Sequence, residues 1–264
     1  MRFVFGLLSV LSVSAALGDT LGQADSRGVG GVAEIFQAEG LDGTFVLASS
    51  AGEILYVHND ERSRTRYSPA STFKILNTLI ALDAAVVTSK NSEFIWDGKD
   101  RGVAAWNRDQ TLESAFRVSC VWCYQQIARE VGNSRYLVAL ANNSYGNQYV
   151  GDQVDQFWLN DDLQISALGQ IEFLVKLVNY SLPFSRQHVD ILKAIMLDES
   201  GTDYAIYAKT GWTGPGLHVG WYVGFVEKRD KTWLFAMNMR MDRAEQASLR
   251  KELSVRSLKI LGIL

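Results

Sequence analysis

The chain has 264 residues, of which 47% are hydrophobic and 21% charged, and its formal net charge is −3. This size suits one large domain or two intergrown subdomains, and the composition is that of an ordinary globular protein. Nothing basic stands out, so the charge balance disfavours a nucleic-acid-binding role.

The first residues have the order of features that is typical of a secretory signal peptide. Arg2 supplies a positive charge, an apolar run extends from Phe3 to Val13, and small residues lead to Gly18. The run is too short for a membrane-spanning helix, which needs about 20 apolar residues. We therefore expect cleavage of residues 1–18, leaving a domain of residues 19–264 in the periplasm without a stable membrane anchor. An uncleaved anchor or a buried N-terminal helix is the alternative.

Strand patterns lie at both ends of this domain and flank a helical middle. The predicted elements are, in chain order, a helix over 30–39, strands Thr44–Ser49 and Glu53–His58, a helical region from about 65 to 195, strands Tyr204–Lys209, Gly220–Glu227 and Thr232–Met239, and a helix over roughly 244–262. The pattern contains no internal repeat.

Short turns between neighbouring strands, such as the charged turn Lys228–Lys231, favour antiparallel pairing. The economical fold is α+β: an antiparallel sheet assembled from both ends of the chain, flanked by N- and C-terminal helices, with an inserted all-helical subdomain. We expect the sheet subdomain to comprise about 19–64 and 196–264, and the helical subdomain about 65–195.

The two cysteines, Cys120 and Cys123, are spaced C-x-x-C within the helical region. Residues three apart on a helix are neighbours, so a local disulfide is conceivable in an oxidising compartment. Two buried thiols and a catalytic dithiol are the alternatives. No βαβ pattern surrounds the pair, which disfavours the catalytic dithiol.

The sharpest motif is Pro69-Ala70-Ser71-Thr72-Phe73-Lys74, followed by the apolar helical pattern of Ile75 to Leu82. Pro69 suits a helix start, so Ser71 is expected in the first turn with Lys74 on the same face. A serine hydroxyl is a weak nucleophile until a base removes its proton, and a lysine one turn away can do so if its amine is neutral. Taken alone, Ser-x-x-Lys is more typical of a capped helix start.

Two further segments change that interpretation. Ser119-Cys120-Val121 lies in the helical middle, and Lys209-Thr210-Gly211 follows a predicted strand and precedes Trp212. Ser-x-x-Lys, Ser-x-Asn or Ser-x-Val, and Lys-Thr-Gly, in this order, are the three elements of the penicillin-recognising serine enzymes. Each could be structural by itself, with Ser119 a helix cap and Lys209 a solvated strand end, but their joint occurrence favours chemistry.

The sequence resembles the class D β-lactamases, the oxacillinases, over nearly all of residues 19–264. The segments that carry the resemblance are Tyr67–Lys74, Trp96-Asp97-Gly98, Gln126–Glu130, Tyr145-Gly146-Asn147, Phe157-Trp158-Leu159, Lys209-Thr210-Gly211 and Leu249-Arg250-Lys251. The Glu-x-x-Leu-Asn motif of class A is absent. The resemblance implies hydrolysis of the β-lactam amide through an acyl-enzyme on Ser71.

The absent glutamate bears on how water is activated. In class D enzymes the lysine beside the nucleophile carries a carbamate made from carbon dioxide, and this anion serves both half-reactions. The resemblance assigns that role to Lys74. Only a neutral amine reacts with carbon dioxide, and an apolar pocket favours the neutral form. By resemblance, the residues that line this pocket are Phe73, Val121, Trp158 and Leu159, with Trp158 donating its indole N–H to the carbamate.

The same resemblance implies the other roles. Ser119 relays a proton to the departing lactam nitrogen, and Lys209 supports that relay. The backbone N–H groups of Ser71 and Trp212 form the oxyanion hole. The substrate carboxylate is bound by Thr210 and Arg250 beside Gly211. The two N–H groups of a guanidinium can donate to both carboxylate oxygens at once. The short glycine-rich stretch 212–219 borders the substrate site in this family, which leaves the substrate range open.

Other chemistries lack their motifs. The three histidines, at 58, 188 and 218, are not spaced as zinc ligands, so we expect no metal. No Gly-x-Ser-x-Gly elbow, P-loop or Gly-x-Gly-x-x-Gly is present, so we expect no cofactor beyond the carbamate on Lys74.

The expected partners are small β-lactam substrates, with neither nucleic acid nor membrane involved, and the expected state is a monomer or homodimer. One alternative function is that of a β-lactam sensor of the same fold, which acylates without turnover. Such receptors carry membrane helices and a signalling portion, and neither is indicated here. A peptidoglycan transpeptidase or carboxypeptidase is a second alternative, disfavoured by the short chain and by the Trp158 segment.

Overall fold

The computed structural model describes residues 26–214 and 216–264, so the predicted signal peptide, 1–18, lies outside the described residues. Within those two segments, no helix has the length and apolarity needed to cross a membrane.

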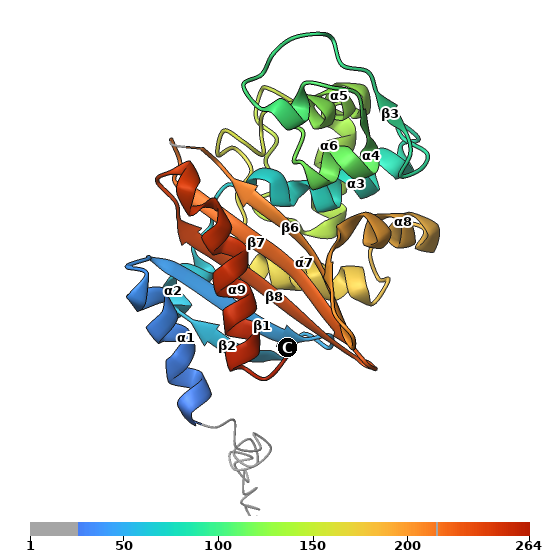
Figure 1. Ribbon diagram of the computed structural model, residues 1–264. Helices are drawn as coiled ribbons and strands as arrows, with labels where there is room; N and C mark the ends of the chain where they lie inside the picture. Colours follow the sequence, from blue (N-terminus) through green and yellow to red (C-terminus); the bar gives the residue numbers. More distant parts are fainter. Residues whose placement is uncertain (1–25, 215) are drawn as a thin grey trace, which may run out of the picture.

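A six-stranded antiparallel sheet forms the centre of the molecule (Figure 1). Its spatial order is β2-β1-β8-β7-β6-β5. The strands are β1 (Gly43–Ser49), β2 (Ile54–His58), β5 (Leu197–Ser200), β6 (Tyr204–Trp212), β7 (Val219–Lys228) and β8 (Lys231–Arg240). Because β1 pairs directly with β8, the first and last strands of the chain are neighbours. This confirms the prediction of one sheet assembled from both ends.

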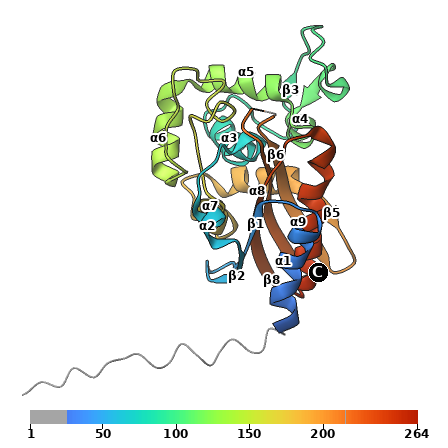
Figure 2. The ribbon, with the colours of Figure 1, turned by 90° about the vertical axis from the view of Figure 1, so that its left-hand side faces the viewer.

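Alternate residues of β1 enter different hydrophobic layers, as the period of two in a strand requires. Phe45 and Leu47 join the layer beneath the terminal helices α1 (Ser26–Ala38) and α9 (Leu249–Ile260). Val46 and Ala48 face the opposite layer, which includes Leu174 of α7 (Ala167–Val178). Figure 2 shows α9 and α7 on opposite sides of the sheet. The sheet is therefore covered on both faces.

Helices α3 to α6 gather beyond one side of the sheet, as Figure 1 shows. The remaining elements are α2 (Asp60–Arg64), η1 (Ala70–Phe73), α3 (Lys74–Asp83), β3 (Glu93–Phe94), η2 (Ala104–Trp106), β4 (Gln110–Thr111), α4 (Leu112–Arg117), α5 (Val121–Val131), α6 (Asn133–Asn143), α8 (Arg186–Met196) and η3 (Ala244–Ser248). The structure thus has the predicted α+β class with flanking terminal helices.

Several element boundaries differ from the predicted ones. Strand β6 continues through the Lys209-Thr210-Gly211 motif to Trp212, because this segment still pairs with β7, from Lys209↔Val223 to Trp212↔Gly220. The first helix begins at Ser26 rather than residue 30, and the last helical stretch divides into η3 and α9. The small β3–β4 pair and strand β5 were not predicted, since two to four residues are too few to show alternation.

Gly224 lets β6 and β7 approach closely beside this motif. It pairs with Ala208, and a Cβ added at Gly224 would stand 2.7 Å from the Ala208 Cα. We expect Gly224→Ala to lower the free energy of unfolding by about 2–3 kcal/mol, because backbone must move to accept the methyl group. Urea unfolding measures this change. Gly216→Ala, whose new Cβ would meet nothing within 4 Å, is the control, and equal effects of the two variants would contradict the prediction.

Candidate active site

Ser71 and Lys74 lie at a change of helix type. Ser71 is in the 3-10 turn η1, whose Thr72 N–H donates to Pro69 O at 3.1 Å, and the α-helix proper starts at Lys74. The predicted first turn of an α-helix is therefore a 3-10 turn. Lys74 Nζ is hydrogen-bonded to Ser71 Oγ at 3.1 Å. Ser71 is 7% exposed and Lys74 is fully buried, so only the serine reaches the surface.

The Lys74 amine lies in surroundings that disfavour its charge. Burial lowers the pKa of Lys74 well below its usual value, and the nearby positive charge of Lys209 lowers it further. Among the described residues no carboxylate forms an ion pair with Lys74. The ring of Tyr124 lies 4.8 Å from Nζ and closes one side of the pocket. A neutral amine next to a serine hydroxyl is the arrangement that general-base chemistry requires.

The predicted lysine-pocket residues are brought toward this same end of α3. Phe73, which precedes Lys74, stacks on Trp158 with ring centroids 5.8 Å apart. The indole Nε1 of Trp158 is buried and has no hydrogen-bond partner among the residues that the structure describes. Val121 and Leu159 line the cavity in front of Ser71. A buried N–H donor without an acceptor is costly, which marks this spot as one suited to an anion.

Ser119 and Lys209 come from distant segments and meet beside Ser71. Lys209 Nζ donates to Ser119 Oγ at 2.6 Å and to Thr210 Oγ1 at 3.2 Å. Ser119 holds a left-handed backbone conformation, φ 56°, in the turn between α4 and α5. Burial, and secondarily the charge of Arg250, lowers the pKa of Lys209 to about 7. This lysine can therefore donate or accept a proton near neutral pH.

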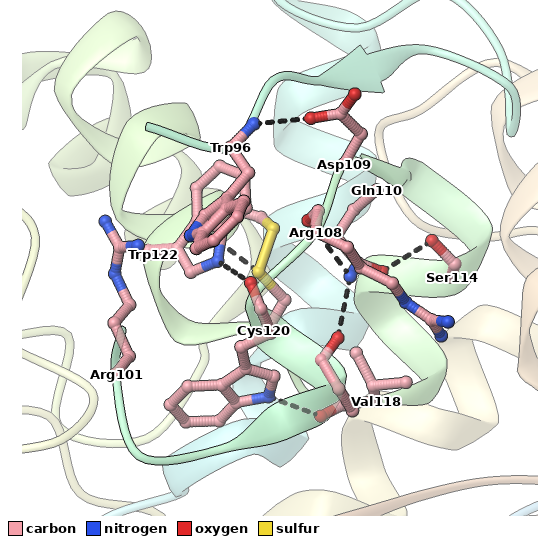
Figure 3. The surroundings of a disulfide bond; sticks show 12 residues. Trp96, Arg101, Arg108, Asp109, Gln110, Ser114, Val118, Cys120 and Trp122 are labelled. Carbon is pink, nitrogen blue, oxygen red and sulfur yellow. Dashed lines mark hydrogen bonds between the residues drawn. A yellow bond between two sulfur atoms is a disulfide. The ribbon is translucent and has the colours of Figure 1, made fainter. Parts of the chain in front are cut away.

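Cys120 and Cys123 form a disulfide at the start of α5 (Figure 3). Cys120 is the N-cap residue, and its Sγ accepts a hydrogen bond from the Cys123 N–H at 3.2 Å. Both cysteines are fully buried. Of the three states left open by the sequence, the structure has the disulfide, and it is buried between Ser119 and the first turn of α5.

Two tryptophans tie the 95–109 segment to the Ser119 turn. Trp106 Nε1 donates to Val118 O at 2.9 Å, and Trp122 Nε1 donates to Trp106 O at 2.9 Å. Figure 3 shows Trp96, Arg101 and Trp122 gathered next to the disulfide. The segment that carries Trp106 is therefore hydrogen-bonded to Val118, before Ser119, and to Trp122, after it.

A cavity of about 340 Å³ opens over Ser71. Its lining residues are Ser71, Trp106, Arg117, Val118, Ser119, Val121, Leu159, Thr210, Gly211, Trp212 and Arg250. Eight of the twelve predicted site residues lie on it, and the other four, Phe73, Lys74, Trp158 and Lys209, are buried behind its surface. A larger cavity, about 480 Å³, lies between α3, α6 and residues 183–184, but none of the motif residues lines it.

Arg250 closes one side of the cavity. Its Nη1 donates to Gly211 O at 2.6 Å and its Nε to Ala247 O at 2.8 Å. Burial lowers the pKa of this guanidinium to about 10, so it remains a cation at neutral pH. Gly211 itself is packed tightly, since a Cβ there would lie 3.0 Å from Pro69 O.

Three lining residues, Trp106, Arg117 and Val118, were not predicted. Val118 adjoins the Ser119 motif, and Trp106 follows the quoted Trp96-Asp97-Gly98 segment, but neither position carries a chemical pattern of its own. Arg117 resembles any solvated helix residue in the sequence. In the part of the chain that the structure describes, no group of three or more His, Cys, Asp or Glu residues could hold a metal ion.

Comparison with known proteins agrees with this arrangement. The family described as "Penicillin binding protein transpeptidase domain" matches residues 43–258. Beta-lactamase OXA-10 of Pseudomonas aeruginosa is 40% identical over 233 residues, which is 87% of this chain and 88% of the relative. Beta-lactamase OXA-48 of Klebsiella pneumoniae is 42% identical over 218 residues, 82% of each chain. A class D β-lactamase structure from Nostoc superposes with a TM-score of 0.86 at 37% identity, covering 88% of this chain and 99% of that one.

The fold and the serine–lysine site thus define a penicillin-recognising serine enzyme. Within that class, the chain belongs to the class D β-lactamases, which are hydrolases.

The pKa of Lys209 predicts a pH-dependent stability. This lysine has a pKa of about 7 when folded and about 10.4 when unfolded, so between these values the unfolded chain binds one more proton. The free energy of unfolding should then rise with pH across this window. We expect Lys209→Met to reduce that slope by up to about 1.4 kcal/mol per pH unit in urea titrations. The exposed variant Lys231→Met should keep the wild-type slope, and an unchanged slope for Lys209→Met would contradict the prediction.

Proposed function

We propose that this protein hydrolyses the lactam amide of penicillins and related antibiotics through a covalent acyl-enzyme on Ser71, which confers resistance to them. The observation that carries this proposal is the 3.1 Å contact between Ser71 Oγ and the buried amine of Lys74, whose pKa burial lowers well below its usual value. Once carboxylated, Lys74 would supply the base that takes the hydroxyl proton as the oxygen attacks the lactam carbonyl.

The groups around Ser71 support the rest of the acylation step. The backbone N–H groups of Ser71 and Trp212 would hold the developing oxyanion, since both residues line the cavity. The lactam nitrogen must gain a proton when its bond to the carbonyl carbon breaks. The Ser119 hydroxyl would supply that proton and be replenished by Lys209, to which it is hydrogen-bonded at 2.6 Å.

The cationic side of the cavity supports binding of the substrate carboxylate. Thr210 offers a hydroxyl and Arg250 a guanidinium, and both line the cavity beside Gly211. The hydrogen bonds that Arg250 donates to Gly211 O and Ala247 O fix the orientation of its guanidinium group. We propose that these two residues orient the lactam ring so that its carbonyl faces Ser71.

We propose that Lys74 is carboxylated by carbon dioxide and that this group would serve both acylation and deacylation. The carbamate, once formed, supplies an anionic base that can activate water. The residues present fit such a group: burial lowers the pKa of the Lys74 amine well below its usual value, and the buried Trp158 Nε1 is a donor that finds no acceptor among the described residues. Phe73, Val121 and Leu159 would keep the surroundings apolar, which favours the neutral amine that reacts with carbon dioxide.

The expected setting completes the proposal. We propose a periplasmic enzyme, secreted through cleavage of residues 1–18, that acts on small β-lactams as a monomer or homodimer. A β-lactam sensor with the same site would stop at the acyl-enzyme, so turnover separates the two functions.

Steady-state hydrolysis of a chromogenic cephalosporin tests the reaction. We expect continuous turnover by the wild type and a loss of at least about a thousand-fold in Ser71→Ala, because no other hydroxyl of the described residues is hydrogen-bonded to the Lys74 amine. Thermal melting checks that the variant is folded. A single burst equal to the enzyme concentration, followed by no further product, would show a sensor rather than a hydrolase.

The carbamate on Lys74 predicts dependence on bicarbonate. We expect activity to fall several-fold after acid treatment in degassed buffer and to return when bicarbonate is added, since protonation of the nitrogen releases carbon dioxide. Trp158→Phe keeps the ring but loses the N–H donor, and it should need more bicarbonate for half-maximal activity. If bicarbonate changes the activity of neither the wild type nor Trp158→Phe, the carbamate is ruled out.

A further inference from the structure

Two of the described residues that line the active-site cavity are charged, and both are arginines, Arg117 and Arg250. Lys209 lies directly behind the same wall. No aspartate or glutamate of the described chain lines this cavity. Arg250 is held by backbone carbonyls and is assigned above to the substrate carboxylate. Arg117 has no part in the proposed mechanism.

The charge of Arg117 is only weakly compensated. It is the last residue of α4, and its side chain is 67% exposed. Its ion-pair partner is Glu113, one turn earlier, at 3.7 Å. Glu113 also faces Lys90 at 3.7 Å, so one carboxylate serves two cations. The cavity rim therefore keeps a net positive charge at Arg117.

The position of Arg117 relates it to the carboxylate side of the cavity. Arg117 and Thr210 line the main cavity together, and both also line a smaller hollow next to it, of about 40 Å³. Asp198 borders that hollow, but its carboxylate is paired with Lys251 at 2.9 Å and accepts a hydrogen bond from Tyr222 at 2.7 Å. Lys251 also pairs with Glu199 at 3.1 Å, so the charge of Asp198 is balanced only in part, but Asp198 forms no ion pair with Arg117.

We propose that Arg117 is a specificity-determining residue that selects substrates by the charge of the substituent next to their carboxylate. The inference rests on the proposed function, which puts the carboxylate on Thr210 and Arg250. In a cephalosporin the C3 substituent is carried by the ring carbon bonded to the one that bears the carboxylate. It therefore extends along the same side of the site and meets Arg117. A cationic substituent is repelled there, and a neutral or anionic one is not.

The test uses two cephalosporins with the same thienylacetyl side chain. Cephalothin has a neutral acetoxymethyl group at C3, and cephaloridine has a cationic pyridiniummethyl group. The measured quantity is the ratio of kcat/KM for cephalothin to kcat/KM for cephaloridine. We expect Arg117→Gln to lower this ratio about three- to five-fold, the effect of one unit charge a few ångströms away in an aqueous cleft, and Arg117→Glu to lower it further. High salt should bring the wild-type ratio toward that of Arg117→Gln.

Arg229→Gln is the matched control, because Arg229 is 79% exposed, has a single acid, Asp203, at 4.0 Å, and lies in the β7–β8 turn away from the cavity. It removes the same charge and should leave the ratio unchanged. An unchanged ratio in Arg117→Gln would overturn the proposal. So would an equal loss for both substrates, which would assign Arg117 to the carboxylate they share. If the wild type hydrolyses neither of these compounds nor a penicillin, the proposed function itself is overturned.

Discussion

The active site depends on the removal of two lysine side chains from water. Lys74 is fully buried and Lys209 nearly so, and neither has a carboxylate at ion-pair distance among the described residues. Burying an uncompensated charge is so costly that the proton leaves instead, and a solvated cation becomes a base or a proton donor near neutral pH. The charge of Lys209 also lowers the pKa of Lys74. Burying these two amines costs the folded protein free energy, and the same burial lowers their pKa values so that they can act as bases or proton donors.

The fold supplies this burial by stacking the η1 turn against the sheet. Gly211 of β6 passes so close to the Pro69 carbonyl that a side chain there would crowd it. Trp221, the β7 partner of Gly211, donates its indole N–H to Ser68 O at 2.9 Å, which ties the chain two residues before this turn to the same strand pair. Three segments far apart in the sequence therefore meet: the η1 turn, the Ser119 turn and β6. The serine–lysine pair and the Lys209–Ser119 pair are held within one wall.

Much of this could be predicted from the sequence, because the motifs and strand patterns are strong. The two-ended sheet followed from alternating hydrophobicity, and the residues around Ser71 followed from the three motifs and the family resemblance. The 3-10 geometry of η1 did not, since Ser-x-x-Lys suits an α-helical turn equally well. Trp106 and Arg117 reach the cavity only through tertiary packing, which leaves no periodic or spacing signal. The state of Cys120 and Cys123 depended on the local cap geometry, which C-x-x-C spacing alone does not determine.

The disulfide has a practical consequence for studying this enzyme in solution. The chain contains two cysteines, and both are consumed in the buried Cys120–Cys123 bond. A thiol introduced anywhere on the surface would therefore be the sole reactive one. Maleimide dyes or spin labels placed on the rim of the cavity could then report on antibiotic entry and product departure in real time, without first stripping native thiols from the protein.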